Sequence, residues 1–539
     1  MAVAWVLGPL GAVALGTLLL ALLLGWLWDT AVTVTRFRVT CHQLRRFPRP
    51  PWRSWLLGHT GLGKSTEEGL QQVDELVAQF RRGCLWWLTP WLPVLRLFHP
   101  DTLRPILLAS AFIAPKDQFS YGFLKPWLGD GLLLSQGQKW ARHRRLLTPA
   151  FHGDVLKSYV GIFNQSTHVM HAKWRAAARA AAQAGAQAGA QAAGRAVGLE
   201  VLEELSLLTL DTLQKCIFSH ESRCQEQPSE YIKAILELST LVVRRHHRLL
   251  HHPTWLYRLS ADGRRFARAC ATVHSFTATV VQRRRQALDR LGHQAWLESH
   301  KGQRMDFIDL LLLAKDEDGN TLSDEDISAE ADTFMFEGHD TTASGLAWLL
   351  YNLARHPHYQ DRCRQEVREL LKGRDVEEIE WEDLSHLPFT TMCIKESLRL
   401  HPPVTAVSRR CTEDIAMRDG RVIPKGIICL LSIYGTHHNP DIWPEHQVFN
   451  PLRFSPENSQ GRSPLAFIPF SAGPRAGRGG RNCIGQSFAM AEMKVVAALT
   501  VARFAIRLDT ERPPRRKPEL ILRAEDGLWL LLEPLPEVA

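Results

Sequence analysis

Cysteine pairs spaced C-x-x-C are absent from this 539-residue chain, whose ten cysteines are scattered. A zinc knuckle or a disulfide framework needs closely spaced cysteines, so we expect neither and predict reduced thiols. No periodic repeat is present, and no basic run is interleaved with stacking aromatic residues. The net charge of +9 therefore suits anionic lipid or an acidic protein partner, and no nucleic-acid partner is expected.

Charge is also absent from residues 1–28, and residues 12–28 are nearly all apolar, long enough to cross a bilayer as a helix. A cleaved signal peptide is the alternative, but the apolar run is longer than such a peptide needs and no basic segment precedes it. The arginines that follow have no acid among them: Arg36, Arg38, Arg45, Arg46, Arg49 and Arg53. By the positive-inside rule that side is cytosolic. We predict a membrane anchor at 1–35, a basic, proline-rich connector at 36–56 and one domain at 57–539.

Most of the remaining chain has the 3.6-residue periodicity of helices, and the fold class we predict is mainly α with small β-sheets, α+β. Helices are expected at Glu68–Phe80, Ser328–Arg355 and His358–Leu371, and a short strand at Ile427–Ser432. The stretch Arg175–Gly198 is rich in alanine, glycine and glutamine and has nothing to anchor a core. It is predicted to be a surface insertion between helices without a catalytic role.

Residues 58–65, GHTGLGKS, match the phosphate-binding pattern G-x4-G-K-S, so a nucleotide triphosphatase is one alternative function. That pattern needs a buried parallel strand directly before it, so that backbone N–H groups at a helix start can hold phosphate. Only Trp55–Leu57 precede it, after the proline-rich connector. This alternative is therefore remote. Nucleotide-dependent stabilisation that Lys64→Ala abolishes would support it.

A single cysteine, Cys483, lies in a loop of glycine and arginine, PFSAGPRAGRGGRNCIG, ahead of an apolar helix. Glycines at 479 and 485 would let the backbone approach a cofactor and donate N–H groups to sulfur, and Arg481 would offset a carboxylate on the cofactor. A buried structural cysteine is the more common fate of an isolated cysteine. Other segments decide between the two interpretations.

The segment KESLRL places Glu396 and Arg399 three residues apart on a helix, and therefore on one face. Such a pair is usually surface charge. Here the neighbours are apolar, and Arg453 in NPLRF is a possible third member. We predict a buried ionic cluster that fixes the cysteine loop.

A second helix carries AEADTFMFEGHDTTASG, with a mid-helix glycine and two adjacent threonines that are locally unfavourable. Something is therefore expected to approach the backbone there. Glu330, Phe334, Glu337 and Thr341 share one face. The hydroxyl of Thr341 and the carboxylate of Asp340 could relay protons to a bound oxygen.

Two further segments are basic. KWARHRRLL places Trp140 and Arg144 one helical turn apart, where they could hold a haem propionate, although a basic surface helix is the plainer interpretation. In RRHHRLLHHP, His247 and His251 have the spacing of a zinc pair on a helix, but no acidic residue is near them in the sequence. That segment is expected to lie on anionic membrane.

With these residues in hand, the chain resembles the cytochromes P-450, and closely their family 4, subfamily F. The resemblance runs from about Phe47 to Pro536 and rests on four motifs in order: EGHDTT, the ExxR pair, NPLRF and the cysteine loop. It implies a cytochrome P-450 fold with Cys483 as the axial thiolate of haem b iron. It also implies that Asp340 and Thr341 are the acid–alcohol pair for proton delivery, and that Glu330 is esterified to a haem methyl.

The resemblance further implies a monooxygenase that ω-hydroxylates long to ultra-long-chain fatty acids, as in lipid metabolism and acylceramide synthesis. Electrons would come from NADPH through NADPH–cytochrome P-450 reductase, with cytochrome b5 a further possible partner besides membrane lipid and the fatty acid. The expected location is the endoplasmic reticulum membrane, or microsome. The protein would be single-pass, with its catalytic domain on the cytosolic side.

The chain departs from the family in its cysteine loop, where PFSAGPR should run directly into NCIG. Six residues, Ala476–Arg481, intervene, so Ala476 stands in the register of the expected phenylalanine and Phe470 lies further back. Either Arg475 or Arg481 is then the partner for a propionate. Two alternatives stay open: a haem-binding protein whose turnover is impaired by the insertion, and an isomerase that needs no reductase.

Overall fold

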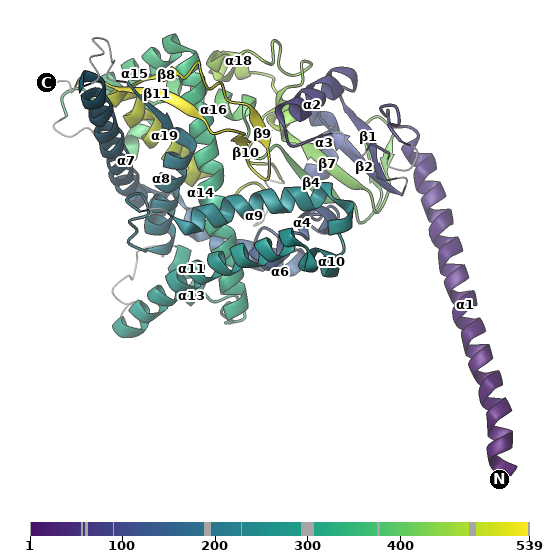
Figure 1. Cartoon of the computed structure of the whole chain (residues 1–539). Helices are drawn as coiled ribbons and strands as arrows, with labels where there is room; N and C mark the ends of the chain where they lie inside the picture. The colour runs from purple at the N-terminus through teal and green to yellow at the C-terminus, as the bar shows by residue number, and fades with distance from the viewer. Residues whose placement is uncertain are drawn as a thin grey trace.

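The N-terminal helix α1 (Ala2–Leu44) projects from the folded body, with the N-terminus at its far end (Figure 1). We describe the protein from a computed structural model, which covers residues 2–54, 58–59, 63–89, 91–187, 196–227, 229–292, 307–374, 378–473 and 481–536. The segment Ala14–Leu44 of α1 is apolar enough to cross a membrane, and its most apolar part is not buried by protein. The helix continues beyond residue 35 because no proline or glycine interrupts it before Pro48.

The body is mostly helical, as predicted. Its helices are α2 (Glu67–Gln79), α3 (Pro100–Leu107), α4 (Gln118–Tyr121), α5 (Lys125–Leu128), α6 (Gly137–Leu147), α7 (Gly153–Gln187), α8 (Val201–Phe218), α9 (Glu230–His247), α10 (Thr254–Leu259), α11 (Ala261–Leu291), α13 (Phe307–Leu313), α14 (Asp324–Arg355), α15 (Pro357–Leu371), α16 (Pro388–Leu400), α17 (Ile433–His437), α18 (Pro456–Ser459) and α19 (Gln486–Arg503).

The strands are short and form small sheets, which confirms the predicted fold class. They are β1 (Gly83–Thr89), β2 (Leu92–Leu97), β3 (Val197–Glu200), β4 (Ala406–Arg410), β5 (Ile415–Ala416), β6 (Val422–Ile423), β7 (Ile428–Ser432), β8 (Phe504–Leu508), β9 (Arg516–Pro518), β10 (Leu522–Ala524) and β11 (Trp529–Pro534). The predicted helices at 68–80, 328–355 and 358–371 are α2, α14 and α15, each starting up to four residues earlier. The predicted strand is β7.

The sheet β1-β2-β7-β4 lies near the base of α1 (Figure 1). Strand β2 runs parallel to β7, with Val94 opposite Ile428, and the other neighbours are antiparallel. One face of this sheet packs into a hydrophobic core that also includes Leu44 and Phe47. Leu44 at the end of α1 and Phe47 in the connector are therefore fastened to the body by apolar burial.

Helix α14 runs through the middle of the helical body (Figure 1) and is buried along most of its length. It packs against α8, α11, α16 and α19. Gly338 makes the close approach to α8 possible, because a Cβ atom at this position would lie 2.4 Å from Cδ1 of Leu213. The mid-helix glycine thus admits a neighbouring helix.

The alanine-rich stretch 175–198, predicted to be a surface insertion between helices, is partly in regular elements. Its first residues are the last turns of α7, which ends at Gln187, and its last two belong to β3. Alanine favours helix, so α7 simply continues into the stretch. Of these residues up to 184, Ala178 is buried and the others are exposed or half-buried. Residues 188–195 lie outside the described chain.

Candidate functional site

A cavity of about 440 Å³ lies between α14, the loop before α19, α6 and strand β4. Its wall is largely apolar and includes Leu132, Leu213, Ile217, Phe334, Phe336 and Leu398. The cavity also brings together several polar residues that are far apart in the sequence. Among them are Cys483, Thr341 and a group of basic side chains.

Cys483 lies three residues before the start of α19, and its surface faces the cavity. Its backbone N–H donates to the carbonyl of Phe470 at 2.8 Å, which fixes the turn before the helix. Protein surrounds the thiol on its other sides. This burial, with the nearby Glu337 carboxylate, raises the pKa of Cys483 to about 11, against the N–H of Gly485 and the charges of Arg144 and Lys116. A thiolate here therefore needs a cation bonded to sulfur, as a haem iron would be.

Four basic side chains line the cavity: Lys116, Arg144, Arg409 and Arg481. The one carboxylate among the described wall residues is Glu337, so the wall carries an excess of positive charge in an otherwise apolar setting. Haem has two propionate groups, and such a wall suits a dianion. Cysteine, apolar wall and cations together fit the group that the resemblance implies.

Of the predicted propionate contacts, Trp140, Arg144 and Arg481 are all in the cavity wall. Arg481 donates to the carbonyls of Ala109, at 3.2 Å, and Ala114. Burial, with repulsion from Arg409, lowers the pKa of Arg481 to about 10. Arg475 lies outside the described residues, so its predicted contact stays a prediction.

The face of α14 that was predicted to meet the cofactor does line the cavity at Phe334, Glu337 and Thr341. The hydroxyl of Thr341 donates to the carbonyl of Glu337 at 2.8 Å, one turn back on the helix. Burial raises the pKa of Glu337 to about 7, with Lys116 acting in the opposite direction. The helix thus presents a hydroxyl and a carboxyl group on the wall of the cavity.

Asp340, the predicted partner of Thr341, is buried and is not in the cavity wall. Its two carboxylate oxygens accept from Nη2 of Arg523, both at 2.6 Å. Arg523 belongs to β10, and nothing in its local sequence marked it as a partner. The acid and the alcohol therefore point to different surroundings: an ion pair and the cavity.

Glu330 is fully buried and is also absent from the cavity wall, although Phe334, one turn further along α14, belongs to it. Oε1 of Glu330 lies 2.5 Å from Nδ1 of His143 on α6, and Oε2 accepts from the N–H of Leu132 at 3.0 Å. Leu132 is itself a wall residue. Glu330 thus reaches the margin of the cavity through the backbone of Leu132.

The extra residues of the cysteine loop do not separate Phe470 from Cys483. Phe470 lines the cavity and accepts the N–H of Cys483. The ends of the enlarged bend also meet, because a Cβ atom at Gly473 would lie 2.5 Å from the backbone nitrogen of Arg481. The chain therefore leaves at Gly473 and returns beside it at Arg481, while residues 474–480 lie outside the described chain.

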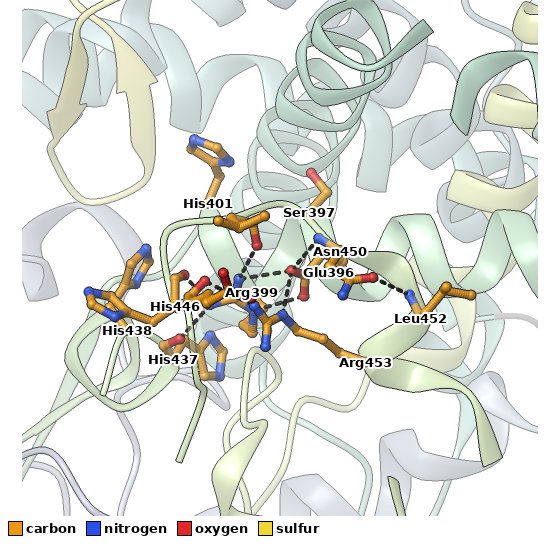
Figure 2. Close-up of polar contacts among 12 residues, drawn as sticks. Glu396, Ser397, Arg399, His401, His437, His438, His446, Asn450, Leu452 and Arg453 are labelled. Atoms are coloured by element: carbon orange, nitrogen blue, oxygen red, sulfur yellow. Dashed lines mark hydrogen bonds and ion pairs between the residues drawn. The ribbon is translucent and has the colours of Figure 1, made fainter. Parts of the chain in front are cut away.

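Glu396 and Arg399 form the predicted buried cluster, with Arg399 at its centre (Figure 2). Arg399 donates Nε and Nη2 to the two carboxylate oxygens of Glu396 at 2.7 and 2.8 Å, and both side chains are fully buried. The third predicted member, Arg453, has Nε 3.3 Å from Oε1 of Glu396. The N–H of Asn450 donates to the same oxygen at 2.9 Å.

A chain of contacts leads from this cluster to the cysteine loop. Arg399 donates to the carbonyl of His437 at 2.8 Å, and Nε2 of His437 accepts the N–H of Ile468 at 2.9 Å. Two residues further on, the carbonyl of Phe470 holds the N–H of Cys483. This path supports the predicted role of the cluster in fixing the cysteine loop.

Among the described residues, neither alternative motif assembles a site; residues 60–62 of the phosphate-binding pattern lie outside them. Ser54 pairs with Gly58 in an isolated antiparallel bridge, which is not the parallel strand that a phosphate-binding loop requires. His247 has Ser65 as a neighbour, with Nε2 and Oγ 3.5 Å apart. Within the described ranges there is no group of three or more potential metal ligands among His, Cys, Asp and Glu.

Comparison with known proteins gives a family match over most of the chain. The family model "Cytochrome P450" matches residues 48–531. The ultra-long-chain fatty acid omega-hydroxylase of Homo sapiens is 60% identical over 500 residues, 93% of this chain and 90% of that protein. Cytochrome P450 4F2 of Homo sapiens is 58% identical, covering 97% of both chains. Leukotriene-B4 omega-hydroxylase 3 of Mus musculus is 57% identical, covering 99% of this chain and 98% of the relative.

Proposed function

Because this chain belongs to the cytochrome P450 family, we propose that it is a membrane-anchored haem-thiolate monooxygenase that hydroxylates the terminal carbon of long-chain fatty acids. The single observation that supports this most is the position of Cys483. Its thiol faces an apolar cavity whose wall also contains Thr341 of α14 and an excess of basic side chains. Relatives that are 60% and 57% identical to this chain are named as fatty-acid and leukotriene omega-hydroxylases.

Bound haem would supply an iron whose thiolate ligand favours cleavage of the O–O bond. Cys483 would be that ligand, and the positive charges of Arg144, Arg409, Arg481 and Lys116 would hold the propionates. We propose that the hydroxyl of Thr341, on the cavity wall, passes a proton inward. Asp340 precedes Thr341 on α14 and pairs with Arg523 of β10, and this charged pair would support the delivery of protons.

Terminal oxidation demands positional control, because the C–H bonds of a methyl group are stronger than those of the adjacent methylene. The wall must therefore restrain the chain so that its last carbon alone reaches the reacting centre. The apolar residues Leu213, Ile217 and Phe336 are placed to pack along an alkyl chain. One relative is named an ultra-long-chain fatty acid omega-hydroxylase. We propose long to ultra-long-chain fatty acids as the substrate class, including those for acylceramide synthesis.

We also propose the ester between Glu330 and a haem methyl. Glu330 is buried, held at two oxygens and adjacent to the wall residue Leu132. A cofactor fixed at its edge would move less and would define the reacting position more sharply. Glu330→Ala is expected to make all haem extractable by acidified organic solvent and to shift oxidation toward interior carbons. Unchanged regiochemistry in that variant would contradict the steering role of the tether.

The proposed electron donor is NADPH, through NADPH–cytochrome P-450 reductase docked on the basic side that carries Cys483, and cytochrome b5 is a further proposed partner. The proposed location is the endoplasmic reticulum membrane, with the body on the cytosolic side, as the arginines after α1 favour. Leu250, Trp255 and Leu259 are exposed large apolar side chains on or beside α10, and they are the proposed contact with lipid.

The decisive experiment is the reduced carbon monoxide difference spectrum of the purified full-length protein. A band near 450 nm is expected for thiolate ligation, and Cys483→Ser is expected to abolish it. Product analysis with reductase, NADPH and fatty acids of graded length should then give the ω-hydroxy acid. A protein without haem, or one whose spectrum indicates histidine ligation, would refute the proposal.

The alternative of impaired turnover is tested by removing six residues, 475–480, which leaves the same sequence as removing the insertion Ala476–Arg481. The contact of Gly473 with Arg481 suggests that the ends of the shortened bend can still be joined, and Phe470 keeps its bond to Cys483. We expect equal haem content and equal turnover in the parent and shortened proteins. A shortened protein with much faster turnover would show that the insertion impairs the natural chain.

A further inference from the structure

His143 of α6 and Glu330 of α14 form a buried contact near the cavity. The function proposed above gives His143 no role. Nδ1 of His143 lies 2.5 Å from Oε1 of Glu330, and neither side chain is reached by solvent. The second ring nitrogen, Nε2, faces Asp326 at 3.7 Å and has no hydrogen-bond partner within the described ranges. Asp326 in turn pairs with Lys139 at 2.7 Å.

Each carboxylate oxygen of Glu330 contacts a different residue, and the two contacts together fix the orientation of the carboxylate. Oε1 is held on the side of α6 by His143, and Oε2 is held by the N–H of Leu132. Leu132 belongs to the cavity wall, whereas His143 does not. The oxygen held by Leu132 is therefore the one at the margin of the cavity.

We propose that His143 is a positioning residue that presents Oε2 of Glu330 to the edge of the haem for ester formation. This inference rests on the tether in the proposed function. His143 holds the oxygen that becomes the ester carbonyl, and it leaves the other oxygen free to form the new bond once it departs from the N–H of Leu132. Helix α6 also carries Trp140 and Arg144 into the cavity wall, so one helix would set both the haem edge and the carboxylate.

Ester formation joins Oε2 to a ring methyl carbon and removes one hydrogen from that methyl, which is a two-electron oxidation. The oxidant required is a peroxide. With hydrogen peroxide, made from O2 and two electrons of NADPH, the carboxylate and the methyl take up one proton and yield the ester and two molecules of water. Atoms and charge balance in this step, and His143 is not consumed by it.

A purely structural role for the pair is the competing interpretation. A buried contact between ionisable groups is weak evidence of a stabilising role, because desolvation offsets much of the attraction. The two interpretations predict different effects of substituting His143. A positioning role depends on a donor at the place of Nδ1, whereas a filler role depends on the volume of the side chain.

A matched pair of variants separates these roles. In His143→Asn the side-chain amide can place its nitrogen where Nδ1 lies, and in His143→Gln the amide lies further out, toward the position of Nε2 and Asp326. Each full-length protein is expressed with its reductase, supplied with NADPH and O2, and acidified in organic solvent. The fraction of haem that stays on the protein is then measured by mass spectrometry. Glu330→Ala, which cannot form the ester, is the control without covalent haem.

We expect His143→Asn to keep most of the covalent haem and His143→Gln to lose roughly tenfold, as for one charge-assisted hydrogen bond. Total haem and the carbon monoxide band should be equal in both. Asp326→Asn, which leaves the bond to Nδ1 intact, should keep the covalent fraction even if His143→Gln does not fold.

An undiminished covalent fraction in His143→Gln, or an equal loss in both variants at full haem content, would overturn the inference. A loss in Asp326→Asn would do so as well. If the parent itself has no covalent haem, the inference and the tether are both wrong. The carbon monoxide spectrum and the ω-hydroxy product then decide the monooxygenase proposal independently.

Discussion

Two buried arginine–carboxylate pairs among the described residues are built differently. Arg399 donates to both oxygens of Glu396 and to the carbonyls of His437, His446 and Val448 (Figure 2). Arg523 uses one nitrogen, Nη2, for both oxygens of Asp340, and its Nε has no partner in the part of the chain that the structure describes.

The difference indicates different duties. A buried charge whose hydrogen-bonding capacity is used up fixes the segments around it and has nothing left to exchange. A pair with unused capacity is a poorer way to stabilise a fold, but it can change its partners when a proton moves nearby. We therefore interpret Glu396–Arg399 as scaffold and Asp340–Arg523 as part of the chemistry.

The largest effect is expected from breaking the pair Glu396–Arg399, called the saturated pair because all the donors of Arg399 are used. Glu396→Ala leaves Arg399 buried without a counter-ion, which costs roughly 3–5 kcal/mol of folding free energy. It also removes the origin of the path through His437 to the cysteine loop. We expect no band near 450 nm and a protein that does not retain haem. A Glu396→Ala protein with normal haem content would show that the cluster is not scaffold.

The second-largest effect is expected at the pair Asp340–Arg523, called the open pair because Nε of Arg523 has no partner among the described residues. Asp340→Asn should fold and bind haem, but product formation should fall by roughly 100-fold because proton delivery loses its charged partner. The measurement is turnover with reductase and NADPH at a matched content of the 450 nm species. Asp340→Asn alone leaves the buried charge of Arg523 unpaired, and the double variant with Arg523→Gln removes that charge. We therefore expect the double variant to regain thermal stability while its turnover stays low. Recovery of turnover in the double variant would make this pair structural too.

A smaller effect is expected at the hydroxyl next to Asp340. Thr341→Ala should lower product per NADPH by roughly tenfold and release hydrogen peroxide instead, because the wall then lacks the hydroxyl at this position of α14. The control is Thr341→Ser, which keeps the hydroxyl and should stay coupled. Tight coupling in the alanine variant would remove Thr341 from the proton path.

The smallest effect extends the comparison to a buried acid without a cation, Glu492 of α19. One of its oxygens accepts from Thr212, the other has no partner among the described residues, and burial raises its pKa to about 8. The folded protein thus holds a proton that the unfolded chain releases near pH 4.5. Folding free energy is therefore lost as the pH rises from about 4.5 to about 8.

Glu492→Gln stays neutral at every pH and should not have this loss. The Tm of the variant is expected to equal that of the parent near pH 4.5 and to exceed it by roughly 2–4 °C near pH 8. Thermal unfolding followed by circular dichroism across this range measures the difference. A constant Tm difference between pH 5 and pH 8 would show that Glu492 does not hold a proton in the folded protein.

Local sequence was sufficient for the saturated pair and insufficient for the open one. Glu396 and Arg399 are three residues apart on one helix, so their contact follows from helical geometry. Asp340 and Arg523 are 183 residues apart, and their meeting depends on how β10 packs against α14. Arginine 523 had no motif around it that could have identified it.

The same limit applies to the cavity wall. Trp140 and Arg144 were predictable from their spacing on α6, and Phe334 and Thr341 from theirs on α14. Lys116 and Arg409 line the same cavity but come from a loop and a strand with no helical period to mark them. His143 lay inside a segment already noticed for its neighbours, and its contact with Glu330 was visible only across two helices.

Helix α1 has a mechanical consequence. Its 43 residues correspond to roughly 65 Å at the usual rise of an α-helix, about twice the thickness of the hydrocarbon layer. The surplus forms a stiff shaft without proline, and its last residue, Leu44, is buried in the core beside the β-sheet. A tilt of the shaft in the bilayer would therefore turn the whole body with it, so the lipid thickness around α1 can set the angle at which the cavity meets the membrane surface.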